Sequence, residues 1–171
     1  MLTHLAKSTL GLIAAICVTT AAFAQEIEAP QGDAILTVTG DITVTNMGDA
    51  LVFDSETLAA LGTESFETTT IWTDGLHSFE GVSLKTLTDL VGAKEGNLFA
   101  TAINDYTIEI PVSDAVENGP IIAFLMDGEQ MSVRDKGPLW IIYPYDTSAD
   151  YRSETIYSRS IWQLDRIEVI K

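Results

Sequence analysis

Apolar positions divide this chain into short segments whose spacing alternates between strand-like and helix-like. Residues 139–143 form an unbroken apolar run that follows Gly137 and Pro138 and stops at Pro144. A run without alternation predicts a strand buried on both faces, and proline cannot continue its ladder. Tyr145 and Asp146 would then leave the end of a central strand, where ligands bind in open sheets. A core strand with an ordinary surface loop gives the same pattern.

Further strands are predicted where β-branched and aromatic residues cluster between turn signals. They cover residues 35–39, 42–45, 66–72, 98–103, 106–110, 121–126, 130–133 and 161–170. Asn104 and Asp105 form the two-residue connection of a hairpin. Segment 146–157 is polar and aromatic without a period, which predicts a long loop.

The clearest helix has apolar residues at helical spacing, namely Leu84, Leu87, Leu90 and Val91. Ser83 is a suitable N-cap for it, and Gly92 ends it. A shorter helix is expected within residues 54–62, and a helical turn after Pro111. Many strands with a few short helices, in an order that is not strictly βαβ, predict an α+β fold with mixed β-sheets.

Residues 1–24 have the features of a secretory signal peptide. Lys7 precedes the apolar run 10–18, and Ala22 and Ala24 fit a small-x-small cleavage site. The run is too short for a lasting membrane span. Cleavage would leave residues 25–33 as an acidic tether and 34–171 as one domain in the periplasm. Cys17, the only cysteine, would leave with the signal peptide.

The charge is strongly negative, with 25 acidic and 9 basic residues and a net charge of −16. Such a chain repels phosphate backbones and anionic lipid surfaces, so nucleic acid and direct membrane insertion are not expected. Solubility alone also accounts for the acidity.

Common catalytic and metal-binding patterns are missing beyond residue 24. His77 is the only histidine there and is expected in an exposed loop. The chain has no Gly-x-Ser-x-Gly elbow, no phosphate-binding glycine loop and no calcium loop, and its residue counts exclude a zinc site of the usual histidine and cysteine type. No catalytic residue and no metal ligand are predicted.

Aromatic and polar residues at predicted strand ends are the candidate ligand-binding set. They could hold a flat heterocycle, because aromatic faces stack on the ring, a carboxylate accepts from its amino edge and an arginine donates to its carbonyl. Filling the core is the alternative role for the tryptophans. The candidate residues are Trp72, Thr73, Asp74, Asn104, Asp105, Tyr106, Arg134, Tyr145, Asp146, Arg159 and Trp162.

Several short motifs, in this order and spacing, resemble the molybdopterin-binding domain of sulfite oxidase-like oxidoreductases. The motifs are Phe79-Glu80-Gly81-Val82 with Leu84 and Leu87, Gly128, Gly137-Pro138-Leu139 with Pro144, and residues 161–167. The resemblance extends from about residue 35 to 170. It implies a sulfite oxidase-like molybdopterin-binding fold with mixed sheets.

This chain departs from the family pattern at the metal ligand. The resemblance implies a molybdenum-binding thiolate at residues 70–72, but these are Thr70, Ile71 and Trp72. A lysine that is frequent in the closing motif is replaced by Trp162. The chain is therefore similar to small secreted members of this fold that bind pterins without metal, some of which are sensors for membrane-bound cyclic-di-GMP enzymes.

This resemblance implies a periplasmic, metal-free pterin-binding sensor that acts on the periplasmic domain of a membrane signalling protein. Trp72 and Tyr145 are expected to bracket the ring, Asp146 or Asp105 to accept from its amino edge, and Arg134 to donate to its carbonyl. The alternatives are a molybdopterin-dependent oxidoreductase or its subunit, and an assembly factor without a ligand.

Overall fold

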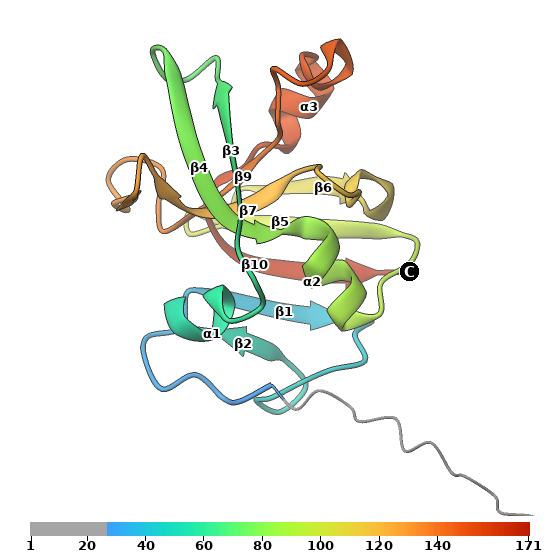
Figure 1. The fold of residues 1–171 in the computed structure, drawn as a ribbon. Coiled ribbons are helices and arrows are strands. Elements are labelled where there is room, and N and C mark those ends of the chain that lie inside the picture. The colour runs from blue at the N-terminus through green and yellow to red at the C-terminus, as the bar shows by residue number, and fades with distance from the viewer. Residues whose placement is uncertain (1–26) are drawn as a thin grey trace, which may run out of the picture.

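A curled mixed sheet dominates the structure, a computed structural model that describes residues 27–171 (Figure 1). The expected signal peptide, residues 1–24, and the first two tether residues lie outside the described residues. Ten strands make up the sheet within residues 27–171. They are β1 Leu36–Gly40, β2 Leu51–Phe53, β3 Glu64–Thr69, β4 Leu76–Ser83, β5 Asn97–Ala102, β6 Thr107–Pro111, β7 Ile121–Met126, β8 Glu129–Gln130, β9 Leu139–Ile142 and β10 Trp162–Ile170.

Strand β10 lies at the point where the sheet branches. The main strand order is β2-β1-β10-β9-β7-β4-β3, and β5 also pairs with β10 and carries β6 on its other edge. The start of β10 pairs with β9, through Trp162 and Trp140, and the rest pairs with β1 in parallel and with β5 antiparallel. The register shifts around Gln163, whose φ of 53° is in the left-handed region. The branch therefore gives the beginning of β10 different neighbours from its end.

Short helices complete the α+β fold. α1 (Ser55–Ala59) contacts β2 and β4, and α2 (Leu84–Val91) contacts β4. α3 (Glu154–Arg159) contacts β6 and stands near the top of the molecule in Figure 1, close to the projecting ends of β3 and β4. Two single turns of 3₁₀ helix, η1 (Val112–Asp114) and η2 (Ala149–Tyr151), are the other helical segments of the described chain. No helix within residues 27–171 is long and apolar enough to cross a membrane.

The strongest sequence patterns correspond to elements of the structure. All residues of β9 are fully buried, as the unbroken apolar run predicted. α2 covers the predicted helix and ends at Gly92 with a φ of 73°. Asp54 caps α1, because its side chain accepts from the Thr57 amide. The hairpin of β5 and β6 and the turn η1 also lie where they were expected.

The strand predicted at residues 42–45 is wrong. This segment runs beside the C-terminal end of α2, and both the amide and the hydroxyl of Thr43 donate to the carbonyl of Val91. The β-branched residues there complete a helix end instead of a ladder. Strand β2 follows later, and its three residues are buried.

Besides β2, the sequence analysis missed β4, η2 and α3. β4 includes His77, which was wrongly expected in an exposed loop. Segment 146–157 is not a continuous loop, because it contains η2 and most of α3. Ser148 and Ser153 cap these two helices through their side chains. Local caps and tertiary contacts stabilise α3, which has no fully buried residue.

The described part of the expected tether is attached to the domain. Gln31 and Gly32 donate their amides to Oδ2 of Asp54, at 2.9 and 2.8 Å. These bonds and those from Thr57 lower the pKa of Asp54, the Thr57 amide having the largest effect. The carboxylate thus joins the N-terminal segment to the start of α1.

Candidate functional site

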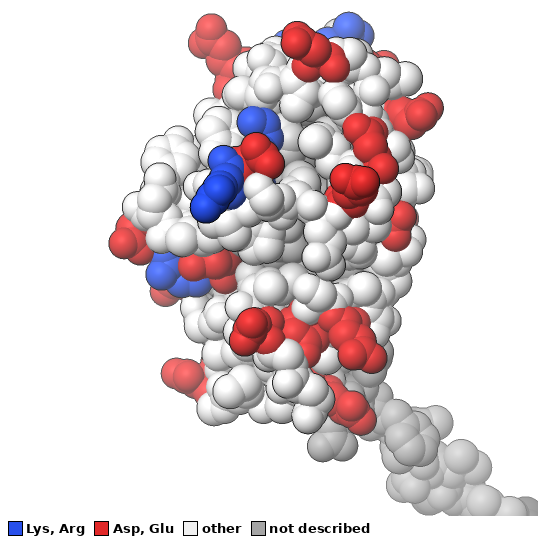
Figure 2. Space-filling view, turned by 90° about the vertical axis from the view of Figure 1, so that its left-hand side faces the viewer, with Lys and Arg blue, Asp and Glu red and all other residues white. Residues whose placement is uncertain are grey.

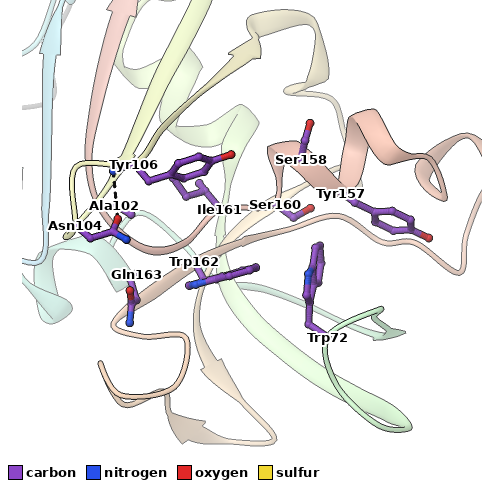
Figure 3. Close-up of a pocket in the computed structure, with 10 residues that line it drawn as sticks. All are labelled: Trp72, Ala102, Asn104, Tyr106, Tyr157, Ser158, Ser160, Ile161, Trp162 and Gln163. Carbon is purple, nitrogen blue, oxygen red and sulfur yellow. Dashed lines mark hydrogen bonds between the residues drawn. The ribbon is translucent and has the colours of Figure 1, made fainter.

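A hollow in the protein surface lies where β10 begins. Its volume is about 460 Å³, within the range of about 300–1,000 Å³ that small-molecule sites occupy. Four segments supply its walls: the β3–β4 loop, the β5–β6 turn, the end of α3 and the start of β10 (Figure 3). The lining residues are Trp72, Ala102, Asn104, Tyr106, Tyr157, Ser158, Ser160, Ile161, Trp162 and Gln163.

Aromatic rings form much of the pocket wall. Trp72 packs edge to face against Trp162, with ring centroids 5.7 Å apart, and against Tyr157 at 5.8 Å. Behind them, Trp140 is fully buried and lies 5.8 Å from Trp72. Tyr106 comes from the β5–β6 turn and is 56% exposed. These rings leave apolar faces available to a flat ligand.

The position of Trp72 is set by its own loop. Oγ1 of Thr70 accepts from the amides of Trp72 and Thr73, both at 3.0 Å. Before the loop, Asp146 accepts from the amide of Thr69 at 2.6 Å and from its hydroxyl at 3.0 Å. These bonds lower the pKa of Asp146, with the Thr69 amide as the main cause. The loop is therefore held both internally and at its N-terminal end.

Two side-chain amides present opposite hydrogen-bonding groups in this pocket. Oδ1 of Asn104 accepts from the amide of Tyr106 at 3.2 Å, so Nδ2 is available as a donor. Nε2 of Gln163 donates to the carbonyl of Val133 at 2.6 Å, so Oε1 is available as an acceptor. Neither available atom has a protein hydrogen-bond partner within residues 27–171. The pocket therefore offers one amide donor and one amide acceptor.

No charged side chain lines the pocket. Lys136 lies beside two of the tryptophans, with its Nζ 5.4 Å from the ring centroid of Trp140 and 5.3 Å from that of Trp162. Figure 2 shows one face of the molecule, on which carboxylates are spread widely and basic side chains are few. The charge of the surface and the neutral lining favour an uncharged or cationic ligand over a phosphate.

Four of the predicted site residues line the pocket, namely Trp72, Asn104, Tyr106 and Trp162. Tyr145 does not, because it is 1% exposed and its hydroxyl donates to Oγ of Ser160 at 2.5 Å. Burial raises the pKa of Tyr145. The expectation that Tyr145 would bracket a ring opposite Trp72 is therefore wrong for this conformation, although the two rings do contact each other at 6.3 Å.

The predicted charged residues lie outside the pocket lining. Asp105 forms an ion pair with Arg166 at 2.6 Å, and Arg134 is exposed. The carboxylate of Asp146 already accepts hydrogen bonds from the amide and the hydroxyl of Thr69. Thr73 and Asp74 belong to the loop that carries Trp72, where Thr73 bonds to Thr70 and the Asp74 carbonyl faces His77. The structure therefore does not bring the predicted carboxylate and guanidinium groups to the pocket wall.

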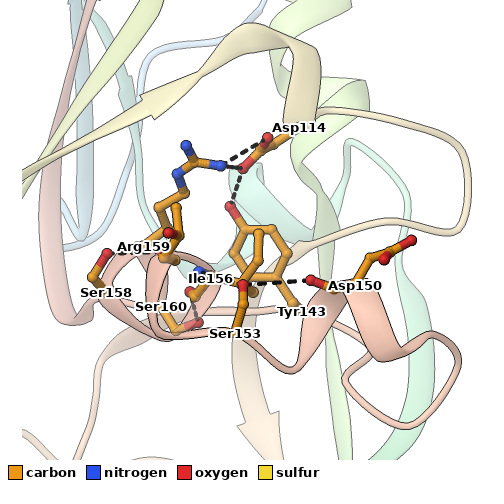
Figure 4. A network of polar contacts seen from close by, with 9 residues as sticks. Asp114, Tyr143, Asp150, Ser153, Ile156, Ser158, Arg159 and Ser160 are labelled. Carbon is orange, nitrogen blue, oxygen red and sulfur yellow. Dashed lines mark hydrogen bonds and ion pairs between the residues drawn. The ribbon is translucent and has the colours of Figure 1, made fainter.

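Arg159, the last residue of α3, forms an ion pair outside the pocket lining (Figure 4). Its Nη1 lies 3.2 and 2.9 Å from the two carboxylate oxygens of Asp114. The hydroxyl of Tyr143 donates to Oδ2 of the same carboxylate at 2.8 Å. Burial is the main cause of the raised pKa of Tyr143, so this hydroxyl keeps its proton. The network joins α3 to η1 and to the end of β9.

Several lining residues were missed as site residues by the sequence analysis. They are Ala102, Tyr157, Ser158, Ser160, Ile161 and Gln163. They belong to the end of β5, to a helix that no periodicity indicated and to a bulged strand start. Their convergence depends on the branching of the sheet.

The donor set does not fit a molybdenum centre. Within residues 27–171 there is no cysteine and no cluster of three or more histidine, cysteine, aspartate or glutamate side chains. Thr70, one of the residues at the position where the resemblance implies a thiolate, already uses its hydroxyl within the loop. A soft thiolate ligand is therefore missing from this part of the chain. The lining also lacks a cation for a cofactor phosphate.

Neither a protein-family model nor a curated protein sequence matches the chain. Among solved structures, the fold is similar to that of the sulfane dehydrogenase SoxCD from Paracoccus pantotrophus, with a TM-score of 0.57 and 16% sequence identity. The match covers 78% of this chain and 37% of that chain, so this chain spans little more than a third of that chain's length. At this identity the likeness shows the fold alone.

Proposed function

We propose that this protein binds a pterin, without a metal ion, in the pocket at the start of β10. The observation that supports this most strongly is the combination of aromatic walls with an unpaired amide donor and an unpaired amide acceptor. A pterin has a flat bicyclic ring and an amino-amide edge. Both features match the groups that the pocket provides.

Different residues would bind the ring of the pterin and its amino-amide edge. Trp72, Tyr106 and Trp162 supply faces for stacking, and each stacked aromatic contributes about 1–3 kcal/mol in comparable base-binding sites. Oε1 of Gln163 would accept from the amino group of the ligand, and Nδ2 of Asn104 would donate to its carbonyl. These amides take the roles that the sequence analysis gave to carboxylates and Arg134.

The alternative is a molybdopterin-dependent oxidoreductase or its subunit, which the distant fold similarity to SoxCD supports weakly. Molybdopterin would supply redox chemistry through its metal, but the described residues offer neither the thiolate nor the phosphate partners. The metal-free ligand is therefore the better match to this pocket.

A sensor role would use α3 as the readout. Tyr157 and Ser158 belong to this helix and also line the pocket, so a ligand contacts it directly. A ligand that stabilises α3 would present a different surface to a partner, which we propose to be the periplasmic domain of a membrane signalling protein. Secretion by the N-terminal signal peptide would place the protein in that compartment.

Hydrogen exchange with and without 6-methyltetrahydropterin tests the binding and the readout together. The proposal expects slower exchange in residues 70–75, 103–106 and 146–160 at saturating ligand, with β1 and β2 unchanged as an internal control. Protection of the first two segments without any change in 146–160 would support ligand binding in the pocket. It would contradict the proposal that α3 is the readout. Unchanged exchange in all of them would contradict the proposed function.

A further inference from the structure

His77 lies between two hydrogen-bond acceptors. Its Nδ1 is 2.6 Å from Oδ2 of Asp127, and its Nε2 is 3.0 Å from the carbonyl oxygen of Asp74. A carboxylate and a carbonyl can only accept, and a neutral imidazole carries one N–H. Both bonds are therefore made together only when both ring nitrogens are protonated.

The carboxylate of Asp127 is a fixed acceptor. It lies in the turn between β7 and β8 with a φ of 53°. Its amide donates to the carbonyl of Ser78 at 2.8 Å, and its Oδ1 accepts from the Ser78 amide at 3.0 Å. These bonds leave Oδ2 directed at the imidazole.

Few other groups can influence the ring. Asp127 from the β7–β8 turn and Asp74 from the β3–β4 loop are the charged groups that act on it. The partner of His77 on β3 is Thr68, and the ring of Phe79 lies 6.4 Å away along β4. Neither of these residues titrates. The proton of His77 is therefore controlled by the same two groups that it joins.

The loop joined in this way is the one that carries Trp72. Asp146 holds its N-terminal end through Thr69, and Thr70 organises its middle. The bond from His77 to the Asp74 carbonyl is the corresponding attachment at its C-terminal end. We infer that His77 is a positioning residue whose doubly protonated ring attaches the β3–β4 loop to the β7–β8 turn and thereby keeps Trp72 against Trp162.

The direction of the pH dependence follows from the same geometry. The hydrogen bond that His77 donates to Asp127 is the main cause that raises the pKa of His77, and burial opposes it. The stabilisation is fully present below the usual histidine pKa of about 6.5 and is lost as the pH rises through the higher pKa of the folded protein. The neutral ring keeps one partner only, so the loop is less firmly attached at alkaline pH.

For the ligand site, this inference rests on the proposed function, because looser attachment of Trp72 matters to binding only if the pocket is used. The position of Trp72 itself can be measured without any ligand. The indole N–H signal of Trp72 in NMR reports its surroundings, and the amide signals of Leu36 and Val38, which are fully buried in β1, serve as a control for the fold.

The experiment is a pH titration of the ligand-free protein, as wild type, His77→Gln and Asp127→Asn. In the wild type, the Trp72 signal should shift in one transition with a midpoint above 6.5, while the amide signals of Leu36 and Val38 stay constant. The transition should be absent in His77→Gln and should occur at lower pH in Asp127→Asn. If His77→Gln fails to fold, the midpoint of the transition in Asp127→Asn tests the inference.

Two results would overturn the inference: a Trp72 signal that does not change while His77 titrates, and a transition that persists in His77→Gln. Adding 6-methyltetrahydropterin at pH 6 and pH 9 separates this inference from the proposed function. If the wild type fails to bind at either pH although the Trp72 transition occurs, the ligand proposal fails and the role of His77 remains. If the wild type binds, the affinity should be several-fold weaker at pH 9, and this difference should be lost in His77→Gln.

Discussion

Trp72 and Trp162 meet edge to face, with ring centroids 5.7 Å apart, although one belongs to the β3–β4 loop and the other to the last strand. Each ring has a buried neighbour, since Trp140 contacts both. The pair therefore joins a loop to the branch point of the sheet. Its outer surfaces form part of a pocket whose lining has no charged side chain.

Removing either indole should weaken binding of a reduced pterin. We expect Trp72→Ala and Trp162→Ala each to cost about 1–3 kcal/mol of binding free energy, or about 5- to 150-fold in affinity, because a stacking face is lost. Isothermal titration calorimetry measures this directly. Met47→Ala removes an exposed apolar side chain that does not line the pocket and is the matched control. Unchanged affinity in Trp72→Ala would remove this residue from the site.

The two amides should determine selectivity for the ligand edge. Gln163→Ala removes the acceptor, so it should weaken a 2-aminopterin by about 1 kcal/mol but leave a 2-oxo analogue, which lacks that amino group, less affected. Asn104→Ala should weaken both ligands. Competition titrations with the two compounds give the ratio of their affinities. Gln130→Ala, a substitution at an exposed glutamine, is the control. An unaltered ratio in Gln163→Ala would show that this side chain does not read the amino group.

The network behind α3 should contribute to stability more than to binding. Tyr143→Phe removes the hydroxyl that donates to Asp114 and leaves the ion pair with Arg159 in place. We expect a loss of about 1–3 kcal/mol in the free energy of unfolding, as for a buried hydrogen bond to a charged group. Urea denaturation measures the change. A midpoint equal to that of the wild type would mean that this hydroxyl does not stabilise the fold.

Asp146 should make the attachment of the β3–β4 loop sensitive to acid. Its pKa is lowered chiefly by the amide of Thr69, so its contribution is present above the usual value near 3.8 and is lost as the pH falls through the lower pKa of the folded protein. The amide signal of Thr69 in NMR should shift with that transition. In Asp146→Asn the transition should be absent. If it persists in that variant, another carboxylate is responsible.

The sequence predicted the elements whose own residues determine them. β9 followed from a continuous apolar run, and α2 from an apolar face and a glycine end, whereas Ser83 makes no side-chain capping hydrogen bond at its N-cap. β4 was missed, because Gly81 and the polar residues before it interrupt the pattern. In the structure, a Cβ at Gly81 would lie 2.1 Å from the carbonyl oxygen of Ile122, so the close approach of β4 and β7 requires glycine there.

The candidate site could be predicted only in part for a related reason. Trp72, Tyr106 and Trp162 stand beside turns or at a strand start, which is visible in the sequence. Tyr145 follows a strand end in the same way, but tertiary packing buries it against Ser160. Gln163 reaches the pocket through a bulge with a left-handed backbone, and no local pattern indicates such a bulge.

The central claim is that the pocket holds a pterin and that no molybdenum is bound. Native mass spectrometry and elemental analysis of the protein isolated from its own cells test this claim directly. The account predicts a non-covalent ligand with the mass and fluorescence of a pterin, substoichiometric or absent molybdenum, and loss of the ligand from Trp162→Ala. Stoichiometric molybdenum, or a ligand that remains bound to Trp162→Ala at wild-type occupancy, would contradict it.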